Sequence, residues 1–513
     1  MSSVSQSERS KSGRAETGGE NLASILTETA SRHGDRIALK LDDTELSYKQ
    51  LEEASARAAG LLRAKGVEVG DRVAVMLPNV PHFAILYFGI LRAGAVVVPL
   101  NPRYGHTEVA YHVGDSGAKL LFAWHQFIGA AEKGAGEHGI EMIPVEPGKF
   151  EEMLGGAEED YSVADRDRND PAVILYTSGT TGAPKGAVLT HGNVAKSTAV
   201  ATTLVEMSAD DVILGALPFF HVFGQACALN SATKLGACIS LVPKFDPKAT
   251  LEAIQRDGVT LFEGVPTMYS SVLNFDQRDE YDTSSLRVGI VGGQAMPVEV
   301  MERFEQAFDI EVLEGYGLSE TTAVGTFNYP GERKPGSIGM PVEGIEVKIV
   351  DDDRDEVPQG EIGEIAIKGP NVMREYWNKT SETEQDLRDG WFHTGDLGHI
   401  DEDGYVFIDD RKKDMIIRGG ENVYPREIEE VLYQHDGIEE VAVVGVEHER
   451  LGEEVAAAVV LKEKDSVRAD EIRDFALDKL AKFKVPTKIW FLDELPKGPT
   501  GKILKRELKP PED

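Results

Sequence analysis

Short apolar runs alternate with amphipathic stretches along the first two thirds of the chain. Residues 47–66 carry apolar side chains at helical spacing, whereas runs such as 72–77 and 172–176 have the length of buried strands. Further runs of the second kind are 95–100, 119–123, 238–242 and 286–293. Short apolar strands between helices are typical of parallel α/β sheets. Because these strands outnumber those of one ordinary sheet, we expect a large N-terminal domain that contains two doubly wound sheets.

The pattern changes near residue 336, where hairpin-like pieces begin. Two alternating segments, 346–353 and 363–369, are followed by a third in which Asp403-Gly404 has the sequence of a tight turn. These pieces predict a small β-barrel-like unit at the end of the large domain.

A basic patch and a Gly-Gly pair in residues 411–432 separate these hairpins from a new alternation of helix and strand. This change predicts a domain boundary near Lys413. The first residues are polar and rich in Ser and Gly, as in disordered termini. We therefore predict a disordered tail at 1–20, an N-terminal domain at 21–412 and a small α+β C-terminal domain at 413–513.

The charge of the chain is strongly negative. Its 88 acidic and 54 basic residues give a net charge of −34, which argues against nucleic acid or an anionic membrane surface as a partner. One interpretation is high solubility. The other, which we favour, is adaptation to a salty cytoplasm, because the Debye length falls to roughly 3 Å near 1 M salt.

Cysteine use and hydropathy indicate an intracellular protein. Cys227 and Cys238, the only cysteines, both lie in an apolar segment, so a disulfide framework is excluded and a reducing compartment is expected. The longest apolar run, 83–91, is about half of what a membrane span requires. We therefore predict a cytoplasmic protein without a transmembrane segment.

A loop rich in Gly and hydroxyl groups, YTSGTTGAPKG at 176–186, directly follows one predicted strand. Its glycines would allow backbone N–H groups to surround an oxyanion, and its hydroxyls and lysine add further donors. These residues are Gly179, Gly182 and Gly186, then Thr177, Ser178, Thr180 and Thr181, and finally Lys185. The loop is not a Walker A sequence, because Gly186 follows Lys185 where Ser or Thr is required. Taken alone, it is either a phosphate loop or a flexible turn.

Six motifs, read in order, identify a family resemblance. They are YTSGTTGAPKG, LPFFHVFG (217–224), EGYGLSET (314–321), WFHTGD (391–396), 410–429 and PKGPTGKILKREL (496–508). This series resembles the adenylate-forming superfamily of acyl-CoA synthetases, peptide-synthetase adenylation domains and luciferases. The resemblance implies that ATP activates a carboxylic acid as acyl-AMP with loss of pyrophosphate, after which a thiol attacks. It also implies ATP, Mg²⁺ and coenzyme A as cofactors or co-substrates, and a mobile C-terminal domain.

The resemblance also assigns a nucleotide site. It places Mg²⁺ at Glu320 with help from Thr177, which suits an oxygen-liganded cation, although Glu320 alone would also fit a helix-capping acid. It places adenine against Tyr316 and the backbone of its neighbours, and ribose at Asp396 and Arg411. The remaining residues of the adenine slot are Gly293, Gln294, Glu314, Gly315, Gly317 and Thr321.

Two lysines have catalytic roles by resemblance. Lys502 would meet the substrate carboxylate and the α-phosphate during adenylation, where an ammonium opposes developing negative charge, and Lys185 of the loop would contact phosphate. Lys413 occupies the hinge position. Gly419 and Gly420 would line the channel for the pantetheine arm, although a simple left-handed turn explains them nearly as well.

The substrate acid is less sharply defined. His221, which we count among the catalytic candidates, lies where amino-acid-activating relatives carry an aspartate, so an amino acid is disfavoured. Apolar residues around it fit an alkyl or aryl group. The general spacing looks most like medium- or long-chain fatty-acyl-CoA ligases, with aryl or branched acids as the alternative.

The thiol acceptor is expected to be coenzyme A, because the chain stops soon after the last motif. Acyl transfer to a carrier protein and a non-catalytic AMP-binding sensor remain as alternatives. We expect a monomer or a homodimer.

Overall fold

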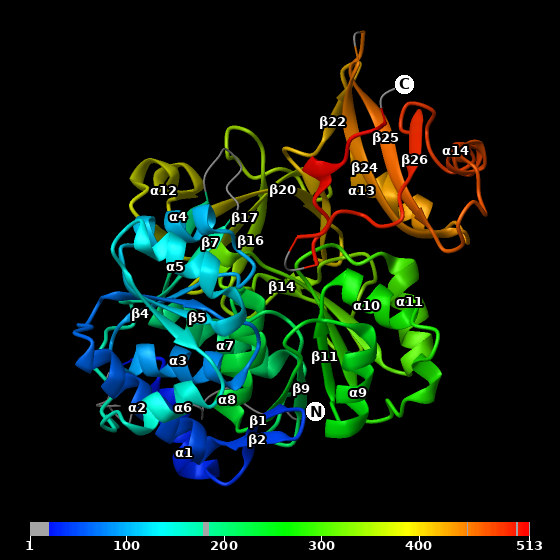
Figure 1. Cartoon of the computed structure of the whole chain (residues 1–513). Helices are drawn as coiled ribbons and strands as arrows, with labels where there is room; N and C mark the ends of the chain where they lie inside the picture. The colour runs from blue at the N-terminus through cyan, green and yellow to red at the C-terminus, as the bar shows by residue number, and fades with distance from the viewer. Residues whose placement is uncertain (1–19, 178–183, 449, 499–500, 512–513) are drawn as a thin grey trace, which may run out of the picture.

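The computed structural model describes residues 20–177, 184–448, 450–498 and 501–511. Two central sheets with their helices lie side by side, a smaller sheet lies beside them, and a separate C-terminal domain sits above the second central sheet (Figure 1). The predicted α/β class with a large N-terminal and a small C-terminal domain is confirmed.

The first central sheet has seven strands, and its middle strands are parallel. Its order is β18 (Glu375–Tyr376), β8 (Lys185–Thr190), β7 (Pro171–Thr177), β4 (Val96–Pro99), β3 (Arg72–Met76), β5 (Ala118–Trp124) and β6 (Glu141–Val145). The helices of this part are α2 (Tyr48–Ala64), α3 (Pro81–Arg92), α4 (His106–Ser116), α5 (Ile128–Gly136) and α6 (Lys149–Gly155). α2 begins where its sequence directs, because Ser47 and Gln50 exchange side-chain and backbone hydrogen bonds in a capping box.

The second central sheet has nine strands and is parallel over its middle six. Its order is β15 (Met340–Pro341), β14 (Thr326–Phe327), β13 (Glu311–Tyr316), β12 (Val288–Val291), β11 (Leu261–Gly264), β9 (Val212–Gly215), β10 (Cys238–Leu241), β1 (Ile37–Leu41) and β2 (Thr44–Ser47). Its helices include α1 (Ser24–His33), α7 (His191–Leu204), α8 (Ser231–Leu235), α9 (Pro247–Asp257), α10 (Pro266–Leu273), α11 (Val298–Phe308) and a π-helical turn, η2 (Gly224–Asn230).

Helix α3 explains the longest apolar run of the sequence. It packs against β3 and β4 of one sheet and against β1 of the other. All but the first of its residues are buried. A helix enclosed between two sheets is apolar on every side, so residues 83–91 form part of the core. Among the residues that the structure describes, no helix is long and apolar enough to span a membrane.

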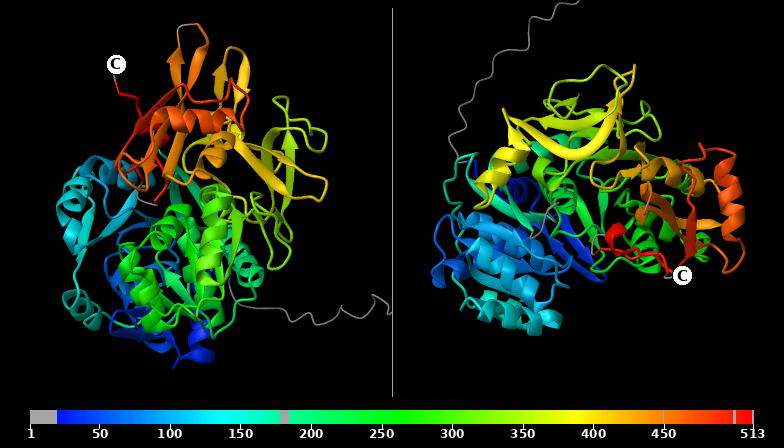
Figure 2. Two further views of the ribbon diagram at one scale, coloured as in Figure 1. Left: turned by 90° about the vertical axis from the view of Figure 1, so that its right-hand side faces the viewer. Right: turned by 90° about the horizontal axis from the view of Figure 1, so that it is seen from above.

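The predicted small β unit is a five-stranded antiparallel sheet (the yellow part of Figure 2). Its strands are β16 (Glu346–Val350), β17 (Gly363–Lys368), β19 (Leu387–Arg388), β20 (Trp391–Ile400) and β21 (Val406–Arg411), with α12 (Thr380–Asp386) beside them. Strands β20 and β21 form the predicted hairpin. Gly404 in its turn has φ 90°, a conformation that favours glycine.

The C-terminal domain is an α+β unit around a second five-stranded sheet. Its elements are β22 (Ile416–Arg418), β23 (Glu421–Val423), α13 (Pro425–Tyr433), β24 (Ile438–His448), β25 (Gly452–Leu461), α14 (Ala469–Leu477) and β26 (Lys488–Phe491). The boundary predicted at Lys413 falls between β21 and β22. The predicted tail lies outside the described residues except for Glu20, whose N–H donates to the Arg166 carbonyl. Both cysteines are free thiols.

Candidate functional site

One pocket opens where parallel strands of the nine-stranded sheet end. β11, β12 and β13 contribute Glu263, Val291 and Tyr316 to its wall. Aromatic and aliphatic side chains such as Phe223 and Val324 line most of the remainder. Ligands of open α/β sheets bind at the carboxyl ends of strands, so this position is the expected one for a substrate site.

Asp396 and Arg411 meet beside Tyr316. The hydroxyl of Tyr316 donates to Asp396 Oδ2 at 2.6 Å, and Arg411 Nε lies 3.4 Å from Asp396 Oδ1. The antiparallel pairing of β20 and β21 places Asp396 directly opposite Arg411. We call these three residues the Asp396 cluster. One carboxylate held between a phenol and a guanidinium can accept hydrogen bonds from a diol.

Lys502 reaches this region from the C-terminal domain. The preceding residue, Gly501, accepts a hydrogen bond from Thr267 Oγ1 at 3.0 Å, which ties the end of the chain to α10. Burial and the charge of Arg411 lower the pKa of Lys502 to about 8, with Asp396 acting in the opposite direction. The ammonium is therefore held close to the Asp396 cluster.

His221 lies close enough to Lys502 to feel its charge. Burial and that charge lower the pKa of His221 to about 4, so its imidazole is neutral at pH 7. Its Nδ1 accepts a hydrogen bond from the N–H of Phe223 at 3.3 Å. The remaining ring nitrogen is then the one that can act as a donor.

A second group of residues surrounds Glu320, and we call it the Glu320 cluster. Glu320 Oε1 accepts hydrogen bonds from Thr177 Oγ1 at 3.2 Å and from the Tyr376 hydroxyl at 2.9 Å. Lys185 pairs with Asp386 at 3.1 Å, and its Nζ lies 4.7 Å from the centre of the Tyr376 ring. Burial raises the pKa of Glu320.

The Glu320 cluster joins both ends of the Gly-rich loop to other elements: Thr177 to the short 3-10 helix η4 (Ser319–Thr321), and Lys185 to β18 and α12. Thr177 precedes the loop and Lys185 follows it, whereas the predicted phosphate donors Ser178, Gly179, Thr180, Thr181 and Gly182 lie outside the described residues. Among the described residues, no group of three or more His, Cys, Asp or Glu side chains has the arrangement of a metal site. Mg²⁺ needs only one or two carboxylates when phosphates and water complete its shell, so the buried Glu320 and the Thr177 hydroxyl fit it.

The predicted adenine slot follows the end of β13. Gly317 has no room for a side chain, because an added Cβ would lie 2.2 Å from the backbone of Ala323. Gly293 has φ 79° and lines the pocket together with Gly315 and Tyr316. These residues allow the close backbone approach that a planar base requires.

Two predicted slot residues already use polar groups within the protein. The carboxyl of Glu314 accepts a hydrogen bond from the Met296 N–H at 3.0 Å, and Thr321 Oγ1 accepts one from the Leu318 N–H at 2.9 Å. The carbonyl of Glu314 accepts from the Asn328 N–H at 3.0 Å. The side-chain oxygen of Gln294 and the second carboxyl oxygen of Glu314, Oε2, are buried and have no partner among the described residues, so both are left available to a ligand.

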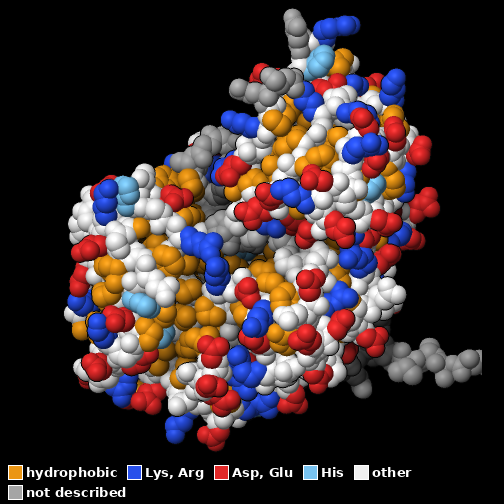
Figure 3. Space-filling model, turned by 45° about the vertical axis from the view of Figure 1, so that its right-hand side comes forward, with side chains coloured by type: hydrophobic (Ala, Val, Ile, Leu, Met, Phe, Trp, Pro, Cys, Tyr) orange, Lys and Arg blue, Asp and Glu red, His pale blue; other side chains and the backbone are white. Residues whose placement is uncertain are grey.

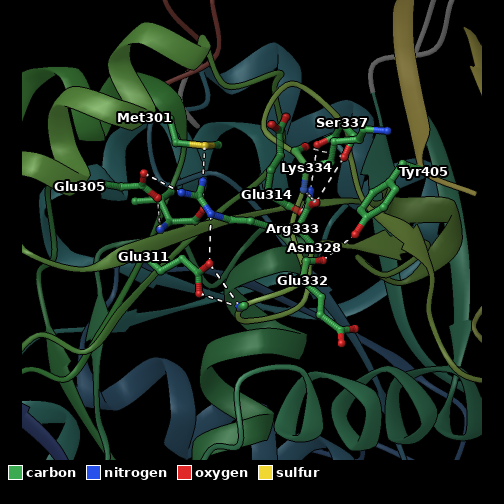
Figure 4. A network of polar contacts seen from close by, with 12 residues as sticks. Met301, Glu305, Glu311, Glu314, Asn328, Glu332, Arg333, Lys334, Ser337 and Tyr405 are labelled. Carbon is green, nitrogen blue, oxygen red and sulfur yellow. Dashed lines mark hydrogen bonds and ion pairs between the residues drawn. The ribbon is translucent and has the colours of Figure 1, made fainter. Parts of the chain in front are cut away.

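A network of charged side chains supports this wall from behind (Figure 4). Arg333 joins Glu305 of α11 at 2.8 Å to Glu311 of β13 at 3.1 Å. Lys334 pairs with Asp401 and with Asp403, the latter at 2.9 Å. The network fixes the connection after β14 to the same strand that carries Tyr316.

The C-terminal domain is docked on the large domain through α13 as well as through Gly501. The N–H of Arg426 donates to Asp410 at 3.1 Å, and its guanidinium donates to the Ile408 carbonyl at 2.7 Å. Glu430 accepts from the N–H of Val298, the first residue of α11, at 3.4 Å. In this orientation Lys502 lies close enough to His221, a residue of the pocket wall, for its charge to lower the His221 pKa.

The predicted Gly419 and Gly420 do not join this site. They form the turn between β22 and β23, with φ 63° and 93°, and the Gly419 N–H donates to the Leu451 carbonyl at 2.8 Å. Lys413 is an exposed residue of the segment between β21 and β22.

Sequence reasoning missed three residues that the fold brings to the site: Tyr376, Asp386 and Glu263. Tyr376 and Asp386 come from β18 and α12, about two hundred residues after the loop that they support. Only the pairing of β18 with β8 brings them there. For Glu263, a signal was present, because a carboxylate inside the apolar strand sequence LFEG is unusual.

Comparison with known proteins agrees with this geometry. The family model described as AMP-binding enzyme matches residues 26–377, and the model described as AMP-binding enzyme C-terminal domain matches residues 427–502. The long-chain-fatty-acid–CoA ligase of Bacillus subtilis (strain 168) is 39% identical, with 95% of this chain and 94% of that protein covered. The feruloyl-CoA synthase of an Amycolatopsis species is 38% identical, with 94% and 95% covered.

Solved structures show the same architecture. The ATP-bound MatB of Rhodopseudomonas palustris superposes with a TM-score of 0.89 at 34% identity, with 95% of this chain and 98% of that chain covered. The two family models together span both domains. This chain therefore belongs to the AMP-binding enzyme family, as an ATP-dependent, AMP-forming acid–CoA ligase that works through an acyl-AMP intermediate.

Proposed function

We propose that this enzyme activates a medium- or long-chain fatty acid. The observation that carries the proposal is a pocket lined mostly by apolar side chains, whose wall includes His221, a residue close enough to Lys502 for the lysine charge to lower its pKa. An apolar acyl chain is stabilised by such a wall, while its carboxylate is drawn to the ammonium. The similarity to a long-chain-fatty-acid–CoA ligase supports the same assignment.

In the first half-reaction, the carboxylate attacks the α-phosphate of ATP and pyrophosphate leaves. Lys502 would stabilise the negative charge that develops between the two reacting groups. Asp396 would accept hydrogen bonds from the ribose hydroxyls, and Tyr316 would cover the adenine. Lys185 and the Gly-rich loop would hold the departing phosphates.

Glu320 and Thr177 would hold Mg²⁺, which neutralises charge on the phosphates when bound. Tyr376 then has a positioning role, because its hydroxyl fixes the Glu320 carboxylate and its ring lies against Lys185. Asp386 restrains Lys185 at the edge of the loop.

In the second half-reaction, the thiol of coenzyme A attacks the acyl-AMP carbonyl, the bond from the acyl carbon to the phosphate oxygen breaks, and AMP leaves. We propose that the C-terminal domain turns about Lys413 for this step, which withdraws Lys502 and brings Gly419 and Gly420 to the pocket for the pantetheine arm. Gly419 and Gly420 are not among the residues that line the pocket in the present orientation, which supports such a rotation. A comparison of thioester formation with free coenzyme A and with an acyl carrier protein as the acceptor tests which thiol is used.

An aryl acid is the second candidate. It is favoured by the 38% identity to a feruloyl-CoA synthase and by the likeness to a benzoate CoA ligase from Burkholderia xenovorans LB400, with a TM-score of 0.89. We further propose that the enzyme acts in the cytoplasm, as its free thiols suggest. We also propose that it is a monomer or a homodimer, and analytical ultracentrifugation would distinguish the two.

The direct test is pyrophosphate release with acetate, octanoate, palmitate and benzoate, each with ATP, Mg²⁺ and coenzyme A. We expect octanoate or palmitate to give the highest kcat/KM. A higher value for benzoate would replace the fatty-acid assignment by the aryl one, and release with none of the four would contradict both.

A further inference from the structure

Glu263 is a buried carboxyl group that the reaction described above does not use. It lies in β11 with 1% of its surface exposed, and neither of its oxygens has a hydrogen-bond partner among the described residues. Burying an unpartnered polar group costs stability. A leucine at this place would fit the strand better, so Glu263 needs an explanation other than packing.

The side chain of Glu263 is part of the pocket wall. Successive residues of a strand face opposite sides, and Phe262 packs in the core on the other face of the sheet. Glu263 is in register with Ile290 of β12, which lines the same pocket. Its charge also raises the pKa of the buried Cys227 thiol, another residue of the pocket wall, after the larger effect of burial.

In the part of the chain that the structure describes, no cation pairs with this carboxyl group. Burial alone raises the pKa of Glu263 to about 8, and no charged neighbour alters it. His221, the one basic side chain among the pocket-lining residues described, is neutral at pH 7. At that pH, Glu263 is therefore largely a neutral carboxylic acid, which offers one O–H donor and a carbonyl acceptor to the pocket.

These properties match a small neutral group that both donates and accepts a hydrogen bond. A hydroxyl does so. An ammonium would require Glu263 to ionise inside an apolar wall, where the other lining side chains offer little to satisfy its three donors. A purely hydrocarbon acyl group would leave both oxygens of Glu263 unsatisfied.

We propose that Glu263 is a specificity residue that hydrogen-bonds a hydroxyl group carried on the acyl part of the substrate. The pocket would then select hydroxylated acids over their deoxy parents. This inference rests on the proposed acid-activating function and narrows its substrate class, for aliphatic and aryl acids alike.

The test compares each hydroxy acid with its parent in the wild-type enzyme and in two variants. The pairs are 4-hydroxycinnamate with cinnamate, 4-hydroxybenzoate with benzoate, and 10-hydroxydecanoate with decanoate. The readout is the ratio of kcat/KM within a pair, measured by pyrophosphate release. A ratio within one enzyme cancels any general loss caused by the substitution.

For at least one pair, we expect the wild-type enzyme to favour the hydroxy acid by tenfold or more, because a site built to bond a hydroxyl discriminates strongly against an analogue that lacks it. Glu263→Leu should remove or reverse the preference. Glu263→Gln, which keeps a donor and an acceptor, should retain most of it. Titration calorimetry of each acid in the presence of AMP repeats the comparison without catalysis.

Three results would overturn the proposal: no preference for any hydroxy acid in the wild type, a preference that persists unchanged in Glu263→Leu, or a stronger preference for 10-aminodecanoate than for 10-hydroxydecanoate. Turnover of the parent acids in each of these cases would leave the acid-activating function standing. If no acid of the panel released pyrophosphate, the proposed function itself would fail together with this role.

Discussion

The charges of Lys502 and His221 depend on each other. Both pKa values are lowered mainly by burial, and each residue lies where an added proton on one disfavours a proton on the other. Because His221 is neutral, Lys502 is the only one of the two side chains that carries a positive charge. It is the charge that an adenylation site needs, because the carboxylate and the α-phosphate repel each other as they meet.

Lys502→Ala separates the two half-reactions. Removal of a charge aimed at a developing oxyanion typically costs roughly 10² to 10³ in rate, so we expect acid-dependent pyrophosphate release to fall by that factor. Thioester formation from supplied acyl-AMP should survive, because that step follows withdrawal of the lysine. Both rates are measured on one preparation, with circular dichroism as a check on folding. Normal pyrophosphate release by the variant would refute the role of Lys502.

The lowered pKa of Lys502 predicts an alkaline limit on adenylation. Since the ammonium is the active form and its pKa in the free protein is about 8, kcat/KM for the acid should fall above pH 8, by tenfold per pH unit at the limit. Thioester formation from supplied acyl-AMP should not fall, because the thiol of coenzyme A ionises over the same range. Lys502→Arg, which stays charged, serves as control. Its pyrophosphate release should be slower than that of the wild type and should not change with pH up to pH 10. If this variant showed the same decrease above pH 8, the decrease would belong to another group.

At this scale, the sequence predicted the residues that lie in local motifs. The family resemblance named Glu320, Asp396, Arg411 and Lys502, because each sits in one of the six motifs, and their roles in the reaction stay predictions. Tyr376 and Asp386 were not named, since their roles arise only when β18 pairs with β8. The expected place of Gly419 and Gly420 at the pantetheine channel stays a prediction, because it depends on a domain orientation other than the one described.

At the level of elements, the ion pairs of Arg333 hold β13 in place. Its side chain is 20% exposed, and those of Glu305 and Glu311 are 16% and 31% exposed. Arg333→Met would leave two partly buried carboxylates without their partner, and we expect a loss of about 1–3 kcal/mol in the free energy of unfolding. The surface pair of Arg32 with Glu28, 60% and 69% exposed, offers a matched control in Arg32→Met. That change should cost less than about 1 kcal/mol.

Chemical denaturation of both variants measures the difference. Equal losses in Arg333→Met and Arg32→Met would mean that the network contributes nothing specific to the wall behind Tyr316.

The segment between β21 and β22 is where we expect the C-terminal domain to rotate. The N–H groups of Asp414 and Met415 both donate to the Arg411 carbonyl, at 2.9 and 3.0 Å, so the chain makes a tight turn here. Proline fixes φ, and Lys413→Pro should therefore slow thioester formation while acyl-AMP formation continues. Lys413→Ala, which removes the charge but leaves φ free, should resemble the wild type in both steps. An equal loss of both steps in Lys413→Pro would show that Lys413 has a structural role only.

The elements themselves were largely predictable. The apolar runs at 72–77 and 172–176 form β3 and β7, and the Asp403-Gly404 hairpin forms as its turn sequence directs. The order of strands was not predictable, because nothing local in the sequence tells β9 to lie between β10 and β11. The packing of the run 83–91 between two sheets could not be predicted either. A helix enclosed between two sheets has the same apolar composition as a fragment of a membrane span.

At the scale of the whole molecule, positive and negative side chains share the surface, but the negative ones are in excess. Asp and Glu side chains are spread over the face seen in Figure 3, with Lys and Arg between them. Many basic residues are already engaged locally, as Arg57 is with Glu53 and Lys484 with Glu427. The excess of 34 negative charges therefore has no internal compensation.

Self-repulsion of this size opposes the compact state unless salt screens it. The Debye length falls from about 10 Å at 0.1 M to about 3 Å at 1 M salt, so we expect Tm to rise steadily with potassium chloride over this range, and pyrophosphate release to rise with it. The docked C-terminal domain should respond first, because its orientation depends on a few polar contacts such as those of Arg426 and Gly501. Adenylation should accordingly decline at low salt before the far-ultraviolet circular dichroism changes. Full activity and an unchanged Tm after dialysis into dilute buffer would contradict adaptation to a salty cytoplasm, and the acidic surface would then serve solubility alone.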